Sequence, residues 1–330
     1  MLSGPSVDDW GVVGHDWAVK RLKRAIAQGG LAQSHLFVGP AHIGKATLAL
    51  ATARALLGHD ARTTALVDKR KHPDLSYIEP EMGGGSIKID GLRALLHTLS
   101  LAPVESRYRV AIIDGAHLMS DGGKNAILKT LEEPNPSVVM ILTAPNVDSV
   151  LPTISSRCQV LNLRSAPVQQ VTADLVRRGV DQKQAAFIAR LARGRMGWAL
   201  NAVNDADVLT ARAENLTDLE TVLGANRTQR FAYAEKLARR DGAHIQAVLE
   251  DWLLLWRDVT RAGTEALNDD QHALIQTLTA TVTRAQSAEI MRAISGTIRN
   301  LDSNVNARLA LDVLLMRLPV VSGSAPASAA

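Results

Sequence analysis

One nine-residue stretch, Gly39 to Thr47 (GPAHIGKAT), constrains the fold of this chain more than any other. Gly39, Gly44 and Lys45 match the pattern G-x-x-x-x-G-K-[ST], in which a glycine loop turns backbone N–H groups toward a phosphate. An apolar run at 36–38 precedes the loop, and a helical pattern follows it. The sequence therefore predicts a phosphate-binding loop (P-loop) between a buried strand and a helix of an α/β domain.

The loop departs from its pattern at Ala46, which stands where a Ser or Thr hydroxyl would bind Mg²⁺. Thr47 comes one position later, so its side chain would point to a different part of the helix. Lys45 could still neutralise phosphate charge. Two interpretations stay open: the loop binds ATP or ADP weakly, or it keeps only the shape of a nucleotide site.

A second motif lies about 70 residues downstream, where the apolar run Val110 to Ile113 ends in Asp114. An apolar strand ending in Asp is the Walker B arrangement, which places a carboxylate near a nucleotide-bound metal. ATPases of this type usually carry Glu next, to polarise the attacking water. The next residue here is Gly115, whose side chain can do no such chemistry.

Short apolar runs alternate with helical patterns up to about residue 165, and this alternation predicts a parallel sheet flanked by helices. The expected strands are 36–38, 110–113, 138–142 and 160–163. Beyond Pro167 the patterns are helical only. The predicted domains are a nucleotide-binding-like domain at 1–165, a small helical unit at 166–205, an all-α domain at 206–320 and a disordered tail at 321–330.

Composition excludes several classes of protein. The chain has 330 residues, and its one cysteine, Cys158, can build neither a disulfide framework nor a cysteine-rich zinc site, so a cytoplasmic location is expected. No run approaches 18 apolar residues, and residues 1–17 lack a signal-peptide pattern, so we expect no membrane association. A net charge of +4 is compatible with nucleic acid nearby but does not establish it.

Five segments occur in an order typical of one family. They are Val13-Gly14-His15, Gly39-Pro40, His72-Pro73-Asp74, Asn125 to Pro134 (NAILKTLEEP) and Leu151 to Cys158 (LPTISSRC). With them the chain resembles the clamp-loader subunits of bacterial DNA polymerase III, in the AAA+ superfamily, most strongly over residues 10–165. The resemblance implies that the helical unit at 166–205 is a lid, and that the domain at 206–320 is a collar for oligomerisation.

Within this family the chain departs from the ATP-hydrolysing gamma/tau type at Ala46, at Gly115 and at Gly197, which replaces the arginine of a Gly-Ser-Met-Arg motif. The segment Gly58 to Lys71 also lacks the cysteines of the family's zinc module, so no zinc is expected. These departures favour the delta prime type, without independent catalysis. The alternatives are an active gamma/tau-type ATPase and a stand-alone DNA-binding AAA+ adaptor.

The resemblance also implies partners and site residues. The partners are gamma/tau and delta subunits, the sliding beta clamp, and primed DNA through the assembled complex, within the DNA-directed DNA polymerase III holoenzyme, a nucleotidyltransferase. Arg157 is expected to act in trans as an arginine finger on ATP bound by a neighbouring subunit. Asn146 could contact a γ-phosphate or serve as a structural hydrogen-bonder. The degenerate nucleotide-binding set is Val13, Gly14, Gly39, Gly44, Lys45, Asp114 and Asn146.

Overall fold

The computed structural model describes residues 10–80, 85–263, 266–302 and 305–321 of the chain. The chain forms two compact units, Met1–Leu200 and Asn201–Ala330, and each is described by itself. The finer predicted boundaries at 165, 205 and 320 stay predictions. The expected tail lies outside the described residues from 322 onward, as do residues 1–9 of the segment expected to lack a signal peptide.

A parallel sheet is the centre of the first unit, and in its described residues five strands pair in the order β2-β3-β4-β1-β5. The strands are β1 (Ser34–Val38), β2 (Leu75–Ile78), β3 (Arg109–Ile113), β4 (Val138–Ala144) and β5 (Gln159–Asn162). The predicted strands are confirmed, and β2 is one that the sequence analysis missed. The predicted α/β class with a parallel sheet is therefore correct.

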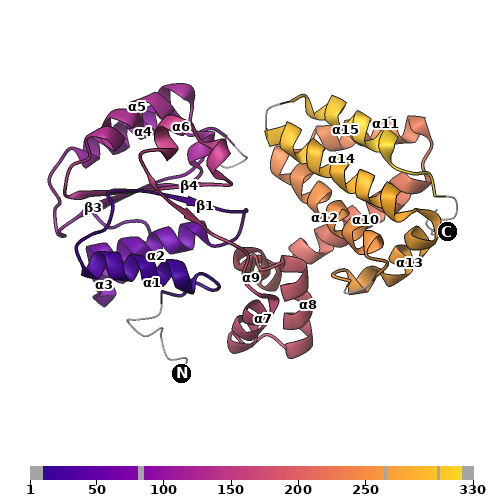
Figure 1. The fold of residues 1–330 in the computed structure, drawn as a ribbon, viewed down its shortest axis with the longest axis horizontal. Coiled ribbons are helices and arrows are strands. Elements are labelled where there is room, and N and C mark those ends of the chain that lie inside the picture. Colours follow the sequence, from indigo (N-terminus) through magenta and orange to yellow (C-terminus); the bar gives the residue numbers. More distant parts are fainter. Residues whose placement is uncertain (1–9, 81–84, 264–265, 303–304, 322–330) are drawn as a thin grey trace. The chain divides into compact units, whose positions relative to one another are not determined.

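Helices cover both faces of this sheet (Figure 1). One layer is α1 (Asp16–Ala27), α2 (Lys45–Leu57) and α3 (Ala61–Asp68); the other is α4 (Ile89–Leu99), α5 (Asp121–Glu132) and α6 (Pro152–Ser155). Alternate strand residues enter the two cores: Phe37 packs with the first layer, whereas Leu36 and Val38 pack with the second. Burial on both faces explains why the central strands are continuous apolar runs.

Three further helices complete this part of the chain: α7 (Val168–Arg177), α8 (Gln182–Ala192) and α9 (Met196–Asn204). Helices α7 and α8 pack against each other, and Asp174 is buried between Arg177 and Arg178, which both pair with its carboxylate. In the described ranges, no helix combines the length and apolar character that a membrane span requires.

The second unit is helical throughout its described residues. Its helices are α10 (Ala206–Gly224), α11 (Arg227–Ala238), α12 (Gly242–Thr260), α13 (His272–Thr281), α14 (Arg284–Asp302) and α15 (Ala307–Arg317). The apolar stripe of α12 forms the core, where Trp252 and Trp256 are fully buried. The Trp252 indole N–H donates to the carbonyl of Asn215 at 2.8 Å, which satisfies its polar atom.

One buried cation holds together the helix ends of the second unit. The Arg230 guanidinium on α11 donates to backbone carbonyls at the end of α10, in the last turn of α15 and just beyond it. These acceptors are Val222, Leu223, Leu315, Leu318 and Pro319. The last carbonyls of a helix have no intrahelical partner, so one arginine satisfies groups from two helices. Burial lowers the pKa of Arg230, but the side chain stays charged.

Candidate nucleotide-binding site

The predicted P-loop lies between β1 and α2. Gly39 follows β1 and donates its N–H to the carbonyl of Ala144 on β4 at 3.2 Å, which fixes the loop entrance against the sheet. Gly44 immediately precedes α2 with φ at 106°, a conformation that favours glycine. The glycines at 39 and 44 and the lysine at 45 thus occupy the strand–loop–helix context that their spacing predicted.

Lys45, the first residue of α2, lies across the mouth of this loop. Its Nζ donates to the carbonyls of Gly39 at 2.7 Å and Pro40 at 2.8 Å. Burial lowers the pKa of Lys45 to about 8, and the carboxylate of Asp114 partly opposes that shift. At neutral pH the ammonium form therefore still predominates, and a positive charge faces the loop.

The Asp114 carboxylate follows β3 and is held by hydroxyl groups of its neighbours in the sheet. Tyr77 on β2 donates to Oδ2 at 2.8 Å, and Thr143 on β4 donates to Oδ1. The Thr143 hydroxyl in turn accepts the N–H of Gly115 at 2.9 Å. Burial and the neighbouring Asp114 charge raise the pKa of Tyr77, which keeps this phenol a donor. The Asp114 carboxylate is thus oriented by hydroxyl groups of the sheet. Position 46 is alanine, so it has no hydroxyl that could bind a metal ion together with this carboxylate.

Two histidines belong to this site, although the sequence analysis did not assign them to it. His117 lies in the short 3₁₀ turn after Asp114. Its pKa is lowered, chiefly by burial and further by the Lys45 charge, and the Asp114 charge partly opposes this shift. His15 is fully buried, and its Nε2 lies 2.9 Å from the carbonyl of Ile43 in the P-loop. The spacing Asp-x-x-His after a strand could have indicated His117, and the segment Val13-Gly14-His15 could have indicated His15.

Gly14, beside the half-buried Val13, lies against the segment that enters α7. A Cβ at Gly14 would approach the Cβ of Ala166 to 2.3 Å, and a Cβ at Gly194 would approach the Ala166 carbonyl to 2.1 Å. Ala166 also donates its N–H to the carbonyl of Gly194 at 3.0 Å. The two glycines therefore leave space for Ala166 between them, and this contact joins the predicted lid to the nucleotide-binding segment.

Gly197 is in direct contact with the tip of the P-loop. Its N–H donates to the carbonyl of His42 at 2.8 Å, and a Cβ added there would lie 2.9 Å from the same oxygen. Glycine stands here in place of the arginine of the Gly-Ser-Met-Arg motif. The structure adds that the bare glycine lets the start of α9 approach the loop backbone closely.

The remaining predicted site residues, Asn146 and Arg157, make local contacts. The exposed Asn146 accepts the N–H of Ser149 at 2.8 Å through its side-chain oxygen, which caps a 3₁₀ turn at Val147–Ser149. Arg157 follows α6 and pairs with Glu132. Among the contacts of the described residues, none joins Arg157 or the Asn146 side chain to the P-loop.

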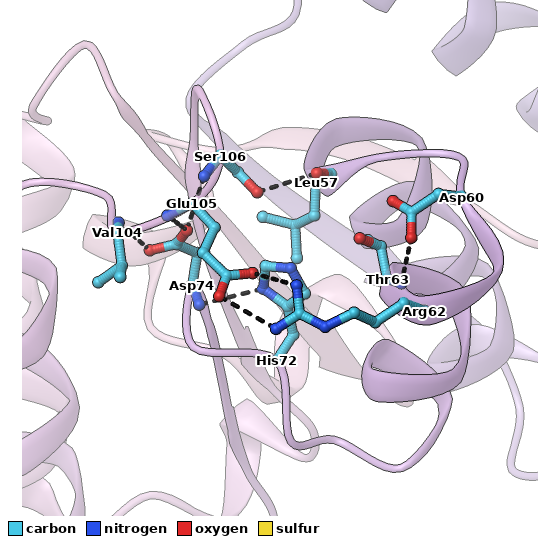
Figure 2. Close-up of polar contacts among 9 residues, drawn as sticks. All are labelled: Leu57, Asp60, Arg62, Thr63, His72, Asp74, Val104, Glu105 and Ser106. Atoms are coloured by element: carbon cyan, nitrogen blue, oxygen red, sulfur yellow. Dashed lines mark hydrogen bonds and ion pairs between the residues drawn. The ribbon is translucent and has the colours of Figure 1, made fainter.

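The His72-Pro73-Asp74 segment binds the loop that precedes β3. Figure 2 shows Asp74 directed at the backbone of residues 104–106, where it accepts the N–H groups of Val104 at 2.6 Å, Glu105 at 2.8 Å and Ser106 at 2.9 Å. Arg109 lies 3.6 Å away at the start of β3. Burial alone would raise the pKa of Asp74, but these donors and Arg109 outweigh it and hold the pKa below its usual range. The segment thus fixes the start of β3, the strand that leads to Asp114.

The segment Gly58 to Lys71 contains α3. Asp60 caps this helix by accepting the N–H of Thr63 at 2.9 Å (Figure 2). In the part of the chain that the structure describes, no group of three or more His, Cys, Asp or Glu residues is arranged to hold a metal ion.

Comparisons with known proteins agree with this geometry. Residues 14–167 match the family model described as DNA polymerase III, delta subunit. The gamma subunit of DNA polymerase III from Buchnera aphidicola subsp. Schizaphis graminum is 27% identical over 72% of this chain and 69% of its own length. The delta' subunit from Bacillus subtilis is 25% identical over 91% of this chain and 94% of its own length.

A solved structure of a gamma subunit-related protein of DNA polymerase III from Thermotoga maritima covers 90% of this chain and 97% of that protein, with 19% identity. The TM-score of this match is 0.43. Over residues 14–167 the chain is therefore similar to the DNA polymerase III delta subunit family, and its relatives are gamma and delta' subunits of DNA polymerase III.

Proposed function

We propose that this chain is a delta prime-type subunit, which helps to load the sliding beta clamp onto primed DNA without hydrolysing ATP itself. The observation that carries the proposal is the combination of Ala46, Gly115 and Gly197 at catalytic positions with an exposed Arg157. The relatives add support, since the delta' subunit of Bacillus subtilis matches almost from end to end, whereas the Buchnera gamma subunit matches over about two thirds.

The local geometry explains why hydrolysis would be poor. Mg²⁺ bound to nucleotide normally uses the hydroxyl after the P-loop lysine, and Ala46 has none. Gly115 has no side chain, so no base follows Asp114. Its φ of 88° would also strain a glutamate at this position. At Gly197 the position of the missing arginine faces the His42 carbonyl. Lys45 and the loop N–H groups could still bind ATP or ADP weakly.

Arg157 would supply chemistry to a neighbour instead. An arginine placed against a transferring phosphoryl group stabilises the charge that develops there, with rate effects of about a thousandfold or more. The Arg157 side chain is 35% exposed and follows a short helix on the surface, so another subunit can reach it. The proposal therefore assigns Arg157 to ATP bound by a gamma/tau subunit.

The second unit offers a surface for assembly. Leu309, Val313 and Met316 on α15 are exposed by 63%, 55% and 38%. They follow one another at helical spacing, and the first two line a groove of about 900 Å³ between α14 and α15, with Gly296 among its lining residues. Large apolar side chains gathered on one surface mark an interaction site. We assign this surface to the contact with other clamp-loader subunits.

The test is reconstitution of the complex with Arg157→Ala, and Arg164→Ala serves as a control because it removes an exposed arginine just after β5. ATP turnover at the site that faces Arg157, stimulated by clamp and primed DNA, should fall by about a thousandfold for Arg157→Ala, and the control should match the unaltered complex. The isolated chain should not hydrolyse ATP. Unchanged turnover and loading with Arg157→Ala would reject the trans-acting role.

The second candidate is an active ATPase of the gamma/tau type. The observation that favours it is that Lys45 and Asp114 are both retained and lie close enough for their charges to interact. Under this alternative the isolated chain hydrolyses ATP, and Lys45→Ala abolishes that activity. Absence of turnover by the purified, folded chain excludes this alternative.

A further inference from the structure

Arg157 is held within its own chain by two contacts. Its NH2 group lies 2.7 Å from Oε1 of Glu132, the last residue of α5, and its NH1 group donates to the carbonyl of Thr153 in α6 at 2.8 Å. The side chains are 35% exposed for Arg157 and 49% exposed for Glu132. The pair therefore lies at the surface, where it is reachable from outside the chain.

These contacts fix the plane of the guanidinium. An isolated arginine side chain samples many rotamers, and ordering it at the moment of reaction would cost conformational entropy. The Thr153 carbonyl and the Glu132 carboxylate restrict the two ends of the planar fork before any partner arrives. A guanidinium has more N–H donors than these two contacts use, so the remaining donors can meet a phosphate.

We propose that Glu132 is a positioning residue for Arg157: it presets the guanidinium so that its remaining donors face the nucleotide of the adjacent subunit. This inference rests on the proposed function, because it assumes that Arg157 acts in trans. Glu132 does not touch the nucleotide and acts only through Arg157.

A carboxylate beside an arginine can also have the opposite effect and withhold the guanidinium from a phosphate. Both side chains are substantially exposed, so water and salt screen the charge of Glu132. Orientation depends on the hydrogen bond and is not screened in this way. We therefore assign Glu132 a helping role, and the two effects predict opposite results for the same variants.

The experiment uses the assembled complex and measures kcat and KM for ATP with Glu132→Ala, Glu132→Gln and the control Glu133→Ala. Glu133 is the adjacent exposed carboxylate. Its replacement removes the same charge, but Glu133 is not one of the residues that contact Arg157. Glu132→Ala should lower kcat about fivefold with KM unchanged, as expected when a transition-state interaction is weakened. Glu132→Gln keeps an acceptor oxygen and should retain most of the rate, and Glu133→Ala should match the unaltered complex.

A double variant separates positioning from a general structural effect. In the Arg157→Ala background, Glu132→Ala should cause no further loss, since residues that act through one another are not additive. An equal fivefold loss in that background, or a rate at or above normal for Glu132→Ala alone, overturns the inference. If Arg157→Ala itself has no effect, the proposed function fails first, so the two failures are distinguishable.

Discussion

Replacement of Asp74 by alanine should destabilise the first unit more than any surface substitution. Asp74 is fully buried and accepts N–H groups from Val104, Glu105 and Ser106 (Figure 2). Arg109 lies 3.6 Å from its carboxylate. Alanine leaves those donors without their acceptor and removes the counter-charge of a buried arginine. Asparagine keeps the size and one acceptor oxygen, so its effect should be smaller.

The magnitude follows from these contacts. Breaking a buried ion pair by removing one partner costs about 3–5 kcal/mol. Arg109 keeps a second acceptor, the carbonyl of Ala102 at 2.7 Å, and the loop N–H groups are near enough to the surface to regain water. The lower end is therefore appropriate: about 3 kcal/mol for Asp74→Ala and about half of that for Asp74→Asn, out of the roughly 5–15 kcal/mol typical of a folded unit.

Hydrogen exchange measured by mass spectrometry can test this in the intact chain. Peptides from β2 and β3 should lose protection corresponding to about 3 kcal/mol, whereas peptides from α12 in the second unit serve as an internal reference. Asp60→Ala is the matched control, because Asp60 is an exposed residue whose carboxylate caps α3 at Thr63 (Figure 2). If protection of β3 in Asp74→Ala stays within about 0.5 kcal/mol of the unaltered chain, the assigned role of Asp74 is wrong.

Further predictions concern pH and two other contacts. The pKa of Asp74 is lower in the folded state than in the unfolded state, where it is about 4, so Asp74 stabilises the fold above pH 4 and loses this effect as pH falls through the folded-state pKa. The difference in unfolding free energy between the unaltered chain and Asp74→Asn, measured by urea unfolding, should therefore shrink only below about pH 4. Arg230→Met should destabilise the second unit by about 3–5 kcal/mol, seen as lost exchange protection of α12, while unchanged protection would contradict the assigned helix-end role. Gly197→Ala should lower the unfolding free energy of the first unit by about 1–3 kcal/mol, because the added Cβ would collide with the His42 carbonyl. The control Gly30→Ala, whose Cβ would meet nothing within 4 Å, should leave it unchanged, and equal urea midpoints for the two variants would refute the contact.

The sequence predicted the central strands well, because strands buried on both faces of a parallel sheet are unbroken apolar runs. It missed β2, where only Leu75 is buried and Ser76 and Tyr77 give no apolar pattern. This strand lies at the edge of the sheet, so one partner suffices to hold it. Its pairing with β3 is a long-range property that local periodicity does not contain.

The candidate site divides in the same way. Spacing alone located the loop around Lys45 and the carboxylate of Asp114, because both depend on residues adjacent in sequence. The hydroxyl of Thr143, which orients Asp114, is brought there by the order of the strands, and the same order brings Lys45 near His117. Sequence also identified what is missing at Gly197, but the carbonyl that occupies the available space comes from a loop about 150 residues earlier.

The packing of Ala166 between Gly14 and Gly194 has a mechanical consequence. A joint that cannot accept one extra methyl group has no slack, so it cannot absorb a displacement by bending. A torque applied to α7 or α8 would pass through Ala166 to β5 and to the segment around Gly14. Such a joint transmits a displacement of α7 or α8 to the segment that precedes α1.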